Sequence, residues 1–344
     1  MIYSIIGILV AKILFPGDPA LVAVAFTSLL LLPELYKIFS IEERQESMEQ
    51  KIGFRELWKD DVDVVKIYIF MFLGILLVYS VGTMLLPELE TNNMFREQLE
   101  IRLGQGFAGN AIDSNSNQLT CEESSFFNGG LFSSILSNNF LVLIACFIMA
   151  LLTGDGAIFL ITWNASVWGT IFGLTAKSAA TYSGSAHYIL FLAIMAIVFC
   201  HMIIEAISYF LAAISGSIIS KDVIMEEFAS DRFFEVFGFN AYLLLMGLVV
   251  LLLGAFVETI VLTLQVPIIS FAIVLLGILA FFLMVKYLIL PENVKSSHLL
   301  NNLFLYFYAF FIALVIMYLL KCPTFGFDPM TYRTIIDMSF KALS

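Results

Sequence analysis

His201 and Glu205 are the two residues of this chain whose types and spacing most directly suggest chemistry. They lie four positions apart in a long apolar stretch, so on a helix they share one face, and Tyr209 extends that stripe by another turn. Three interpretations follow. The pair packs helices together through hydrogen bonds, it relays a proton or binds a cation, or it supplies half of a metal or hydrolytic site, since two ligands do not complete one.

Other polar residues in the neighbouring apolar stretches belong with this pair. Each ionisable group at membrane depth costs about 2.5–3.5 kcal/mol, so such groups face protein or water rather than lipid. We therefore predict one intramembrane polar site, composed of Asp155, Asn164, His201, Glu205 and Tyr209. Secondary candidates for the same site are Asn138, Asn139, His187 and Glu258.

Two of these candidates carry a further interpretation. For Glu258 an interfacial position is the first expectation, and membership of the buried site is the second. His187 and Asp155 have the side-chain types to complete a metal site, but no spacing in the sequence requires one. The sequence thus predicts no bound metal, no cofactor and no catalytic residue.

The composition indicates that these residues lie in a membrane protein. Of 344 residues, 60% are hydrophobic and 13% are charged, with a mean hydropathy of +0.96. The charged fraction is roughly half of the ~25% found in soluble domains. This composition excludes a disordered chain, a disulfide-stapled scaffold and an ordinary soluble enzyme. The net charge of −11 argues against a nucleic-acid partner.

Nine apolar stretches predict an all-α, polytopic transmembrane helical bundle. The first two form a hairpin, because Pro16 and Pro19 interrupt the helix between them. The sixth stretch is too long for a simple span, and it is either one kinked helix or two half-spans. The nine stretches cover about residues 2–15, 20–38, 67–86, 139–153, 157–176, 187–220, 239–264, 267–290 and 301–320.

The loop at 39–66 sets the expected orientation. It is rich in Lys and Arg, which is typical of cytoplasmic loops. Its acidic and basic residues alternate, so it is either a solvated helical hairpin or a docking surface for a cytoplasmic partner. If the sixth stretch crosses once, the N-terminus is cytoplasmic and the C-terminus is external.

The chain is accordingly expected to be organised around a transmembrane core. The predicted parts are a transmembrane hairpin at 1–38, the cytoplasmic charged loop at 39–66, a third span at 67–86, an external loop with an interfacial helix at 87–138, the core at 139–264, two further spans at 265–320 and an external tail at 321–344.

Small residues predict where helices approach closely. Gly169 and Gly173 form a small-xxx-small pair, and Ala212 and Gly216 lie close to the stripe of His201. Two cysteines, Cys121 and Cys322, fall on the predicted external side, where they form either a disulfide or two free thiols.

The string at 154–169, GDGAIFLITWNASVWG, resembles the core of the stage II sporulation protein M family, most closely its archaeal-type branch. The asparagine pair at 138–139 and the stretch at 201–210 resemble the rest of that core, in the same order. Two departures stand out. Met202 occupies a position where family members commonly have glycine, and the chain beyond about Pro267 does not match the family's pattern.

This resemblance covers about residues 1–264 and implies a function. The bacterial namesake acts as a membrane scaffold for peptidoglycan-remodelling partners during engulfment, whereas archaeal relatives generally lack that polymer and have no settled function. The resemblance therefore implies a non-enzymatic scaffold or assembly subunit in the cell membrane. The alternative is an ion- or proton-coupled transporter or channel component that uses the polar site, and a membrane-embedded hydrolase is third. Expected partners are the lipid bilayer, membrane or cytoplasmic proteins and a second copy of the chain.

Overall fold

The structure is a computed structural model, and it describes residues 1–48, 54–104, 128–225 and 231–263. Within these residues every regular element is an α-helix. The helices are α1 (Ile2–Leu14), α2 (Pro19–Met48), α3 (Phe54–Leu85), α4 (Glu88–Met94), α5 (Arg96–Gly104), α6 (Gly129–Thr153), α7 (Ala157–Ser183), α8 (His187–Met225) and α9 (Asp231–Thr263).

Six of these helices are long and apolar enough to cross a membrane, which confirms the predicted membrane-helical fold. Their apolar segments are Pro19–Lys37, Val64–Leu85, Gly129–Thr153, Ala157–Thr181, His201–Ser220 and Phe237–Thr259, and α1 is a shorter apolar helix. These seven helices account for the first seven predicted stretches. The last two, at 267–290 and 301–320, lie outside the described residues, so the number nine stays a prediction.

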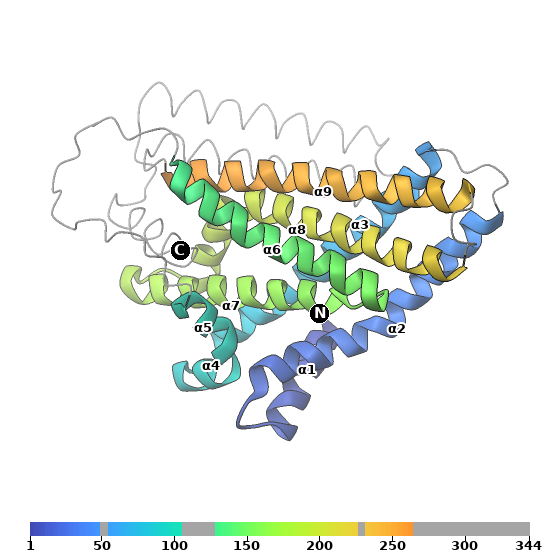
Figure 1. The fold of residues 1–344 in the computed structure, drawn as a ribbon. Helices are drawn as coiled ribbons and strands as arrows, with labels where there is room; N and C mark the ends of the chain where they lie inside the picture. The colour runs from blue at the N-terminus through green and yellow to red at the C-terminus, as the bar shows by residue number, and fades with distance from the viewer. Residues whose placement is uncertain (49–53, 105–127, 226–230, 264–344) are drawn as a thin grey trace, which may run out of the picture.

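The long helices lie side by side, and consecutive ones run in opposite directions (Figure 1). α8 packs most extensively against α9 and α6, while α3 packs against α7 and α1 against α2. α7 also contacts α8, so it joins the α2–α3 side of the bundle to the α6–α8–α9 side. The short helices α4 and α5 lie at one end of the bundle, next to the turn between α1 and α2 (Figure 1).

The fourth predicted span differs from the observed helix. α6 begins at Gly129, ten residues before the predicted start, because Asn128 caps it: the Asn128 side-chain oxygen accepts a hydrogen bond from the Leu131 N–H at 3.1 Å. The apolar residues up to 138, assigned from sequence to an interfacial helix in the external loop, therefore belong to α6 itself. The preceding part of that predicted interfacial helix lies outside the described residues.

α8 settles the question of the sixth stretch. It is a single α-helix of 39 residues, so the alternative of two half-spans was wrong. At 1.5 Å per residue it is about 58 Å long, nearly twice the hydrocarbon thickness, and its apolar crossing segment starts only at His201. No proline interrupts His187–Met225.

The charged stretch at 39–66 is mostly helical. α2 continues past its apolar segment to Met48, and α3 begins at Phe54, ten residues before its own apolar segment. This agrees with the prediction of a helical hairpin. At the opposite end of these helices, exposed ion pairs connect the α1–α2 turn with α4 and α5: Lys12 Nζ to Glu90 Oε2 at 3.0 Å and Arg96 Nη2 to Asp18 Oδ1 at 3.2 Å.

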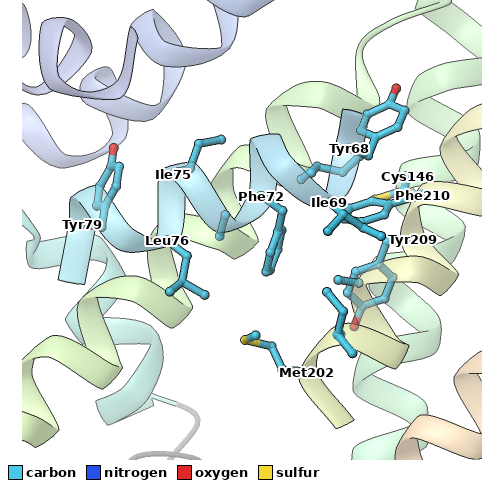
Figure 2. Packing of buried hydrophobic residues seen from close by; sticks show 14 of the residues in the cluster. Tyr68, Ile69, Phe72, Ile75, Leu76, Tyr79, Cys146, Met202, Tyr209 and Phe210 are labelled. Atoms are coloured by element: carbon cyan, nitrogen blue, oxygen red, sulfur yellow. The ribbon is translucent and has the colours of Figure 1, made fainter. Parts of the chain in front are cut away.

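An aromatic cluster joins α3 to α8. The rings of Tyr68 and Phe210 stack with centroids 5.4 Å apart, and Phe72 meets Phe210 edge-on at 5.9 Å. Figure 2 shows these rings beside Ile69, with Cys146 of α6 at the edge of the cluster. Aromatic pairs of this geometry contribute about 0.5–1.5 kcal/mol each beyond the area they bury.

Glycines set the distance between α7 and α3, as their spacing predicted. A Cβ atom on Gly169 would lie 2.5 Å from the carbonyl oxygen of Leu76, and one on Gly173 would lie 2.5 Å from that of Ser80. The close approach lets Ser80 Oγ donate a hydrogen bond to the Gly169 carbonyl at 2.9 Å.

The other two small residues predicted from the sequence, Ala212 and Gly216, pack against two different helices. A Cβ atom on Gly216 would lie 2.5 Å from the Phe147 carbonyl of α6, whereas Ala212 is fully buried and lies near Gly247 of α9. Helices of a membrane bundle gain little from apolar burial alone, so backbone approach of this kind is a main source of their packing energy.

We predict that Gly169→Ala destabilises the protein by about 1–3 kcal/mol, because the added methyl group forces α7 away from α3. Thermal unfolding in detergent measures the loss. Gly238→Ala in α9 is the matched control: apart from its own helix, no described residue lies within 4 Å of the added Cβ, and alanine is the better helix former, so its melting temperature should not fall. Equal melting temperatures for Gly169→Ala and the wild type would contradict the close-packing account.

Candidate functional site

The candidate site is a cavity of about 410 Å³ between α6, α7, α8 and α9, bordered also by Ile101 of α5. Polar and aromatic side chains supply much of its lining. The polar ones are Asn138, Asn139, Asn164, Glu205, Tyr209 and Glu258, and the aromatic ones besides Tyr209 are Trp163, Trp168 and Phe172. A cavity of this size lies within the range of small-molecule sites.

Two carboxyl groups meet at this cavity. Glu205 of α8 is 2% exposed and Glu258 of α9 is 7% exposed, and both side chains line the cavity. Glu258 thus lies on the same buried cavity as Glu205, and its depth relative to the membrane interface stays a prediction.

A glycine makes that meeting sterically feasible. Gly254 lies one helical turn before Glu258, and a Cβ atom on it would lie 2.9 Å from Cγ of Glu205. The absence of a side chain at Gly254 thus leaves room on α9 for the Glu205 side chain. Oε1 of Glu205 has no hydrogen-bond partner among the described residues.

His201 lies one turn before Glu205 and is fully buried. Neither ring nitrogen has a hydrogen-bond partner in the described part of the chain, and the ring instead lies beside Trp168, with centroids 6.1 Å apart. Within the described residues His201 thus makes no interhelical hydrogen bond, and the choice among the three sequence interpretations stays a prediction. Trp168 separates His201 from direct lining of the cavity.

Four further predicted residues line the cavity. Tyr209 lies one turn after Glu205, and Figure 2 shows its hydroxyl directed away from Ile69 and Phe210. Asn138 Nδ2 donates to Asn139 Oδ1 at 3.3 Å. The Asn164 amide donates to the Leu160 carbonyl of its own helix at 2.9 Å.

Two predicted residues lie elsewhere. Asp155 occupies the turn after α6, which ends at Gly154 with φ of +76°, and there it accepts a hydrogen bond from Ser217 Oγ at 3.5 Å. His187 is exposed at the start of α8, fourteen residues before His201, which is about 21 Å along a straight helix. We expected both residues at the site because they lie next to apolar stretches in the sequence. In the structure they lie at helix ends, away from the cavity.

The two tryptophans were missed as site residues. Trp168 lies four positions after Asn164, so both share one face of α7, and this spacing was a readable signal. The described residues contain no group of three or more His, Cys, Asp or Glu arranged to hold a metal ion. The predicted pair Cys121 and Cys322 lies outside the described residues, where the choice between disulfide and thiols stays a prediction.

We predict that the cavity holds water, because unpaired buried polar atoms such as those of His201 and Glu205 are normally satisfied by ordered water. In a variant without the native cysteines, Asn164→Cys should react with a charged thiol reagent, since thiolates form only where water reaches. Leu245→Cys is the control: this residue of α9 is 56% exposed, on a surface that faces lipid, and should stay unreactive. An unreactive Asn164→Cys would contradict a hydrated cavity.

Comparison with known families and proteins agrees with the architecture around this cavity. Searches of curated proteins and of solved structures found no match to the chain. The family model described as stage II sporulation protein M matches residues 64–261, which is more than half of the sequence and includes α6, α7 and α8 and all the cavity-lining residues named above. The chain is therefore a multi-pass membrane protein that belongs to the stage II sporulation protein M family.

Proposed function

We propose that this protein is a membrane transport component that binds a proton or another cation at the pair Glu205 and Glu258. The observation that carries the proposal is the burial of these two carboxyl groups in the lining of one cavity between apolar helices. Ionisable residues inside a bundle usually mark ion pathways, because their cost must be offset by function.

Charge balance explains why a cation is needed. Among the described residues, no ion pair involves Glu205 or Glu258. The basic residues of the observed ion pairs lie at the bundle surface, and they are Lys12, Lys37 and Arg96. Two neighbouring carboxylates repel each other strongly in a medium of low dielectric constant. Bound protons or a bound cation relieve this repulsion, and exchange between the protonated and the cation-bound pair is the elementary step of the proposed coupled transport.

The position of the acids suits such exchange. Glu205 and Glu258 are buried, whereas Asn138, on the same cavity, is exposed. Polar side chains thus line the cavity from the exposed Asn138 of α6 to Glu205 of α8 and Glu258 of α9. His201, behind Trp168, is a second titratable group one helical turn from Glu205.

The proposal predicts that Glu205→Gln and Glu258→Gln each lower cation or proton flux at least about tenfold, since each removes an interaction with a charged group. Flux is measured in proteoliposomes under an imposed pH or salt gradient, with a fluorescent indicator inside. Glu88→Gln, an exposed acid of α4, is the control and should leave flux unchanged. Wild-type flux in both acid variants, with intact monodisperse protein, would overturn the proposal.

A second candidate is the scaffold function that the family resemblance implies, and one observation favours it. α2 and α3 both continue about ten residues beyond their apolar segments, at the same end of the bundle, in a stretch rich in both charges (Figure 1). Such a projecting helical hairpin is suited to docking a cytoplasmic protein. We propose with it a cytoplasmic N-terminus and an external C-terminus, supported by the Lys and Arg content of 39–66.

This candidate predicts that a peptide tag inserted after Met48 is reached by an impermeant reagent only when the membrane is opened. It also predicts that a defined partner co-purifies in fixed stoichiometry, that this partner is lost when the hairpin charges at 39–63 are neutralised, and that Glu205→Gln retains it. Labelling of the tag in closed cells would contradict the orientation. Loss of the partner in Glu205→Gln would instead place assembly at the cavity.

A further inference from the structure

We infer that the ligand of the cavity is an organic ammonium ion, held by the acid pair Glu205 and Glu258 and by the rings of Trp163 and Trp168. This inference rests on the proposed cation site and names the class of cation. It follows from three properties of the cavity: its volume, its aromatic wall and its acidic wall.

Volume is the first argument. A proton needs no cavity, and a single water occupies about 30 Å³ of liquid, so 410 Å³ corresponds to on the order of ten waters or to one small organic molecule. A bare metal ion would leave most of this space unused. It would also need several oxygen ligands at close range, whereas two of the described acidic residues line the cavity.

The aromatic wall is the second argument. Trp163 and Trp168 of α7 both line the cavity. The Trp168 ring is held in place, with Phe172 edge-on at 5.2 Å and His201 at 6.1 Å. Faces of tryptophan attract alkylated ammonium groups more than any other side-chain ring, and an inorganic cation that keeps its hydration shell gains much less from them.

The acidic wall is the third argument, because it lies on other helices. Glu205 comes from α8 and Glu258 from α9, so a ligand in the cavity can contact carboxyl groups of these helices together with indole rings of α7. Oε1 of Glu205 has no partner in the described part of the chain although the residue is 2% exposed. An unpaired acceptor beside an aromatic wall is complementary to an ammonium group, which carries positive charge on an apolar surface.

The tryptophan content makes the inference directly testable. The chain has three tryptophans, and two of them line the cavity, so the variant Trp58→Phe confines intrinsic fluorescence to Trp163 and Trp168. The probe is choline, and its uncharged isostere 3,3-dimethyl-1-butanol is the control ligand. Binding to the full chain in nanodiscs is followed by fluorescence and independently by radiolabelled choline.

We expect choline to change the fluorescence saturably and the uncharged isostere to bind at least about tenfold more weakly. Trp168→Leu should weaken binding of labelled choline about 2- to 30-fold, the range of a cation–π contact, while Trp168→Phe retains part of it. Glu205→Gln combined with Glu258→Gln should abolish binding, and Glu88→Gln should not change it.

Equal binding of choline and its isostere would overturn the inference, because the site would then be apolar rather than cationic. Absence of choline binding, with proton or metal-ion flux that still depends on Glu205, would also overturn it while leaving the proposed transport function standing. Choline binding without any cation flux would support the inference and remove the transport function instead.

Discussion

A polar atom inside this bundle needs a partner from the protein or from bound water, because hydrocarbon offers none, and this constraint organises the structure. Most buried hydroxyl groups meet it locally. Thr27, Ser28 and Thr259 each donate to the carbonyl four residues earlier on their own helix, at 2.8, 2.8 and 2.7 Å. Such bonds need no tertiary contact, so these residues can lie anywhere on a buried face.

Acids and imidazoles cannot be satisfied in this way, since a carboxyl group does not donate repeatedly to helix carbonyls. Glu205 and Glu258 are therefore drawn together across the α8–α9 contact, and the polar amides of α6 and α7 border the same cavity. The close approach of the helices depends on glycine. Gly254 admits the Glu205 side chain, as Gly169 and Gly173 admit the backbone of α3.

The patterns of charged and apolar residues made much of the site and of the helix packing predictable. Glu205, Tyr209 and Asn164 were recognised as one site from their types and spacing, and Gly169 with Gly173 as a packing surface, because helical periodicity places such residues on one face wherever the helix goes. Glu258 was harder. Its distance of 53 residues from Glu205 gives no periodic relation, and an acid near the end of a span is as often at the interface. The prediction for Asp155 was wrong for a different reason. The stretches on both sides of it in the sequence are apolar, but Asp155 itself lies in the turn between two helices.

The sequence by itself determined that this is a helical membrane protein, where most of its spans lie and to which family it belongs, because each property depends on composition, on a period within one helix or on a local string. Only the tertiary structure decided which faces meet. It placed Glu205, Glu258, Trp163 and Trp168 around one cavity, and left His187 and Asp155 outside. The physical reason is that contacts between helices depend on rotation and depth of packing, which glycines and caps set at single positions and which no pattern along one helix records.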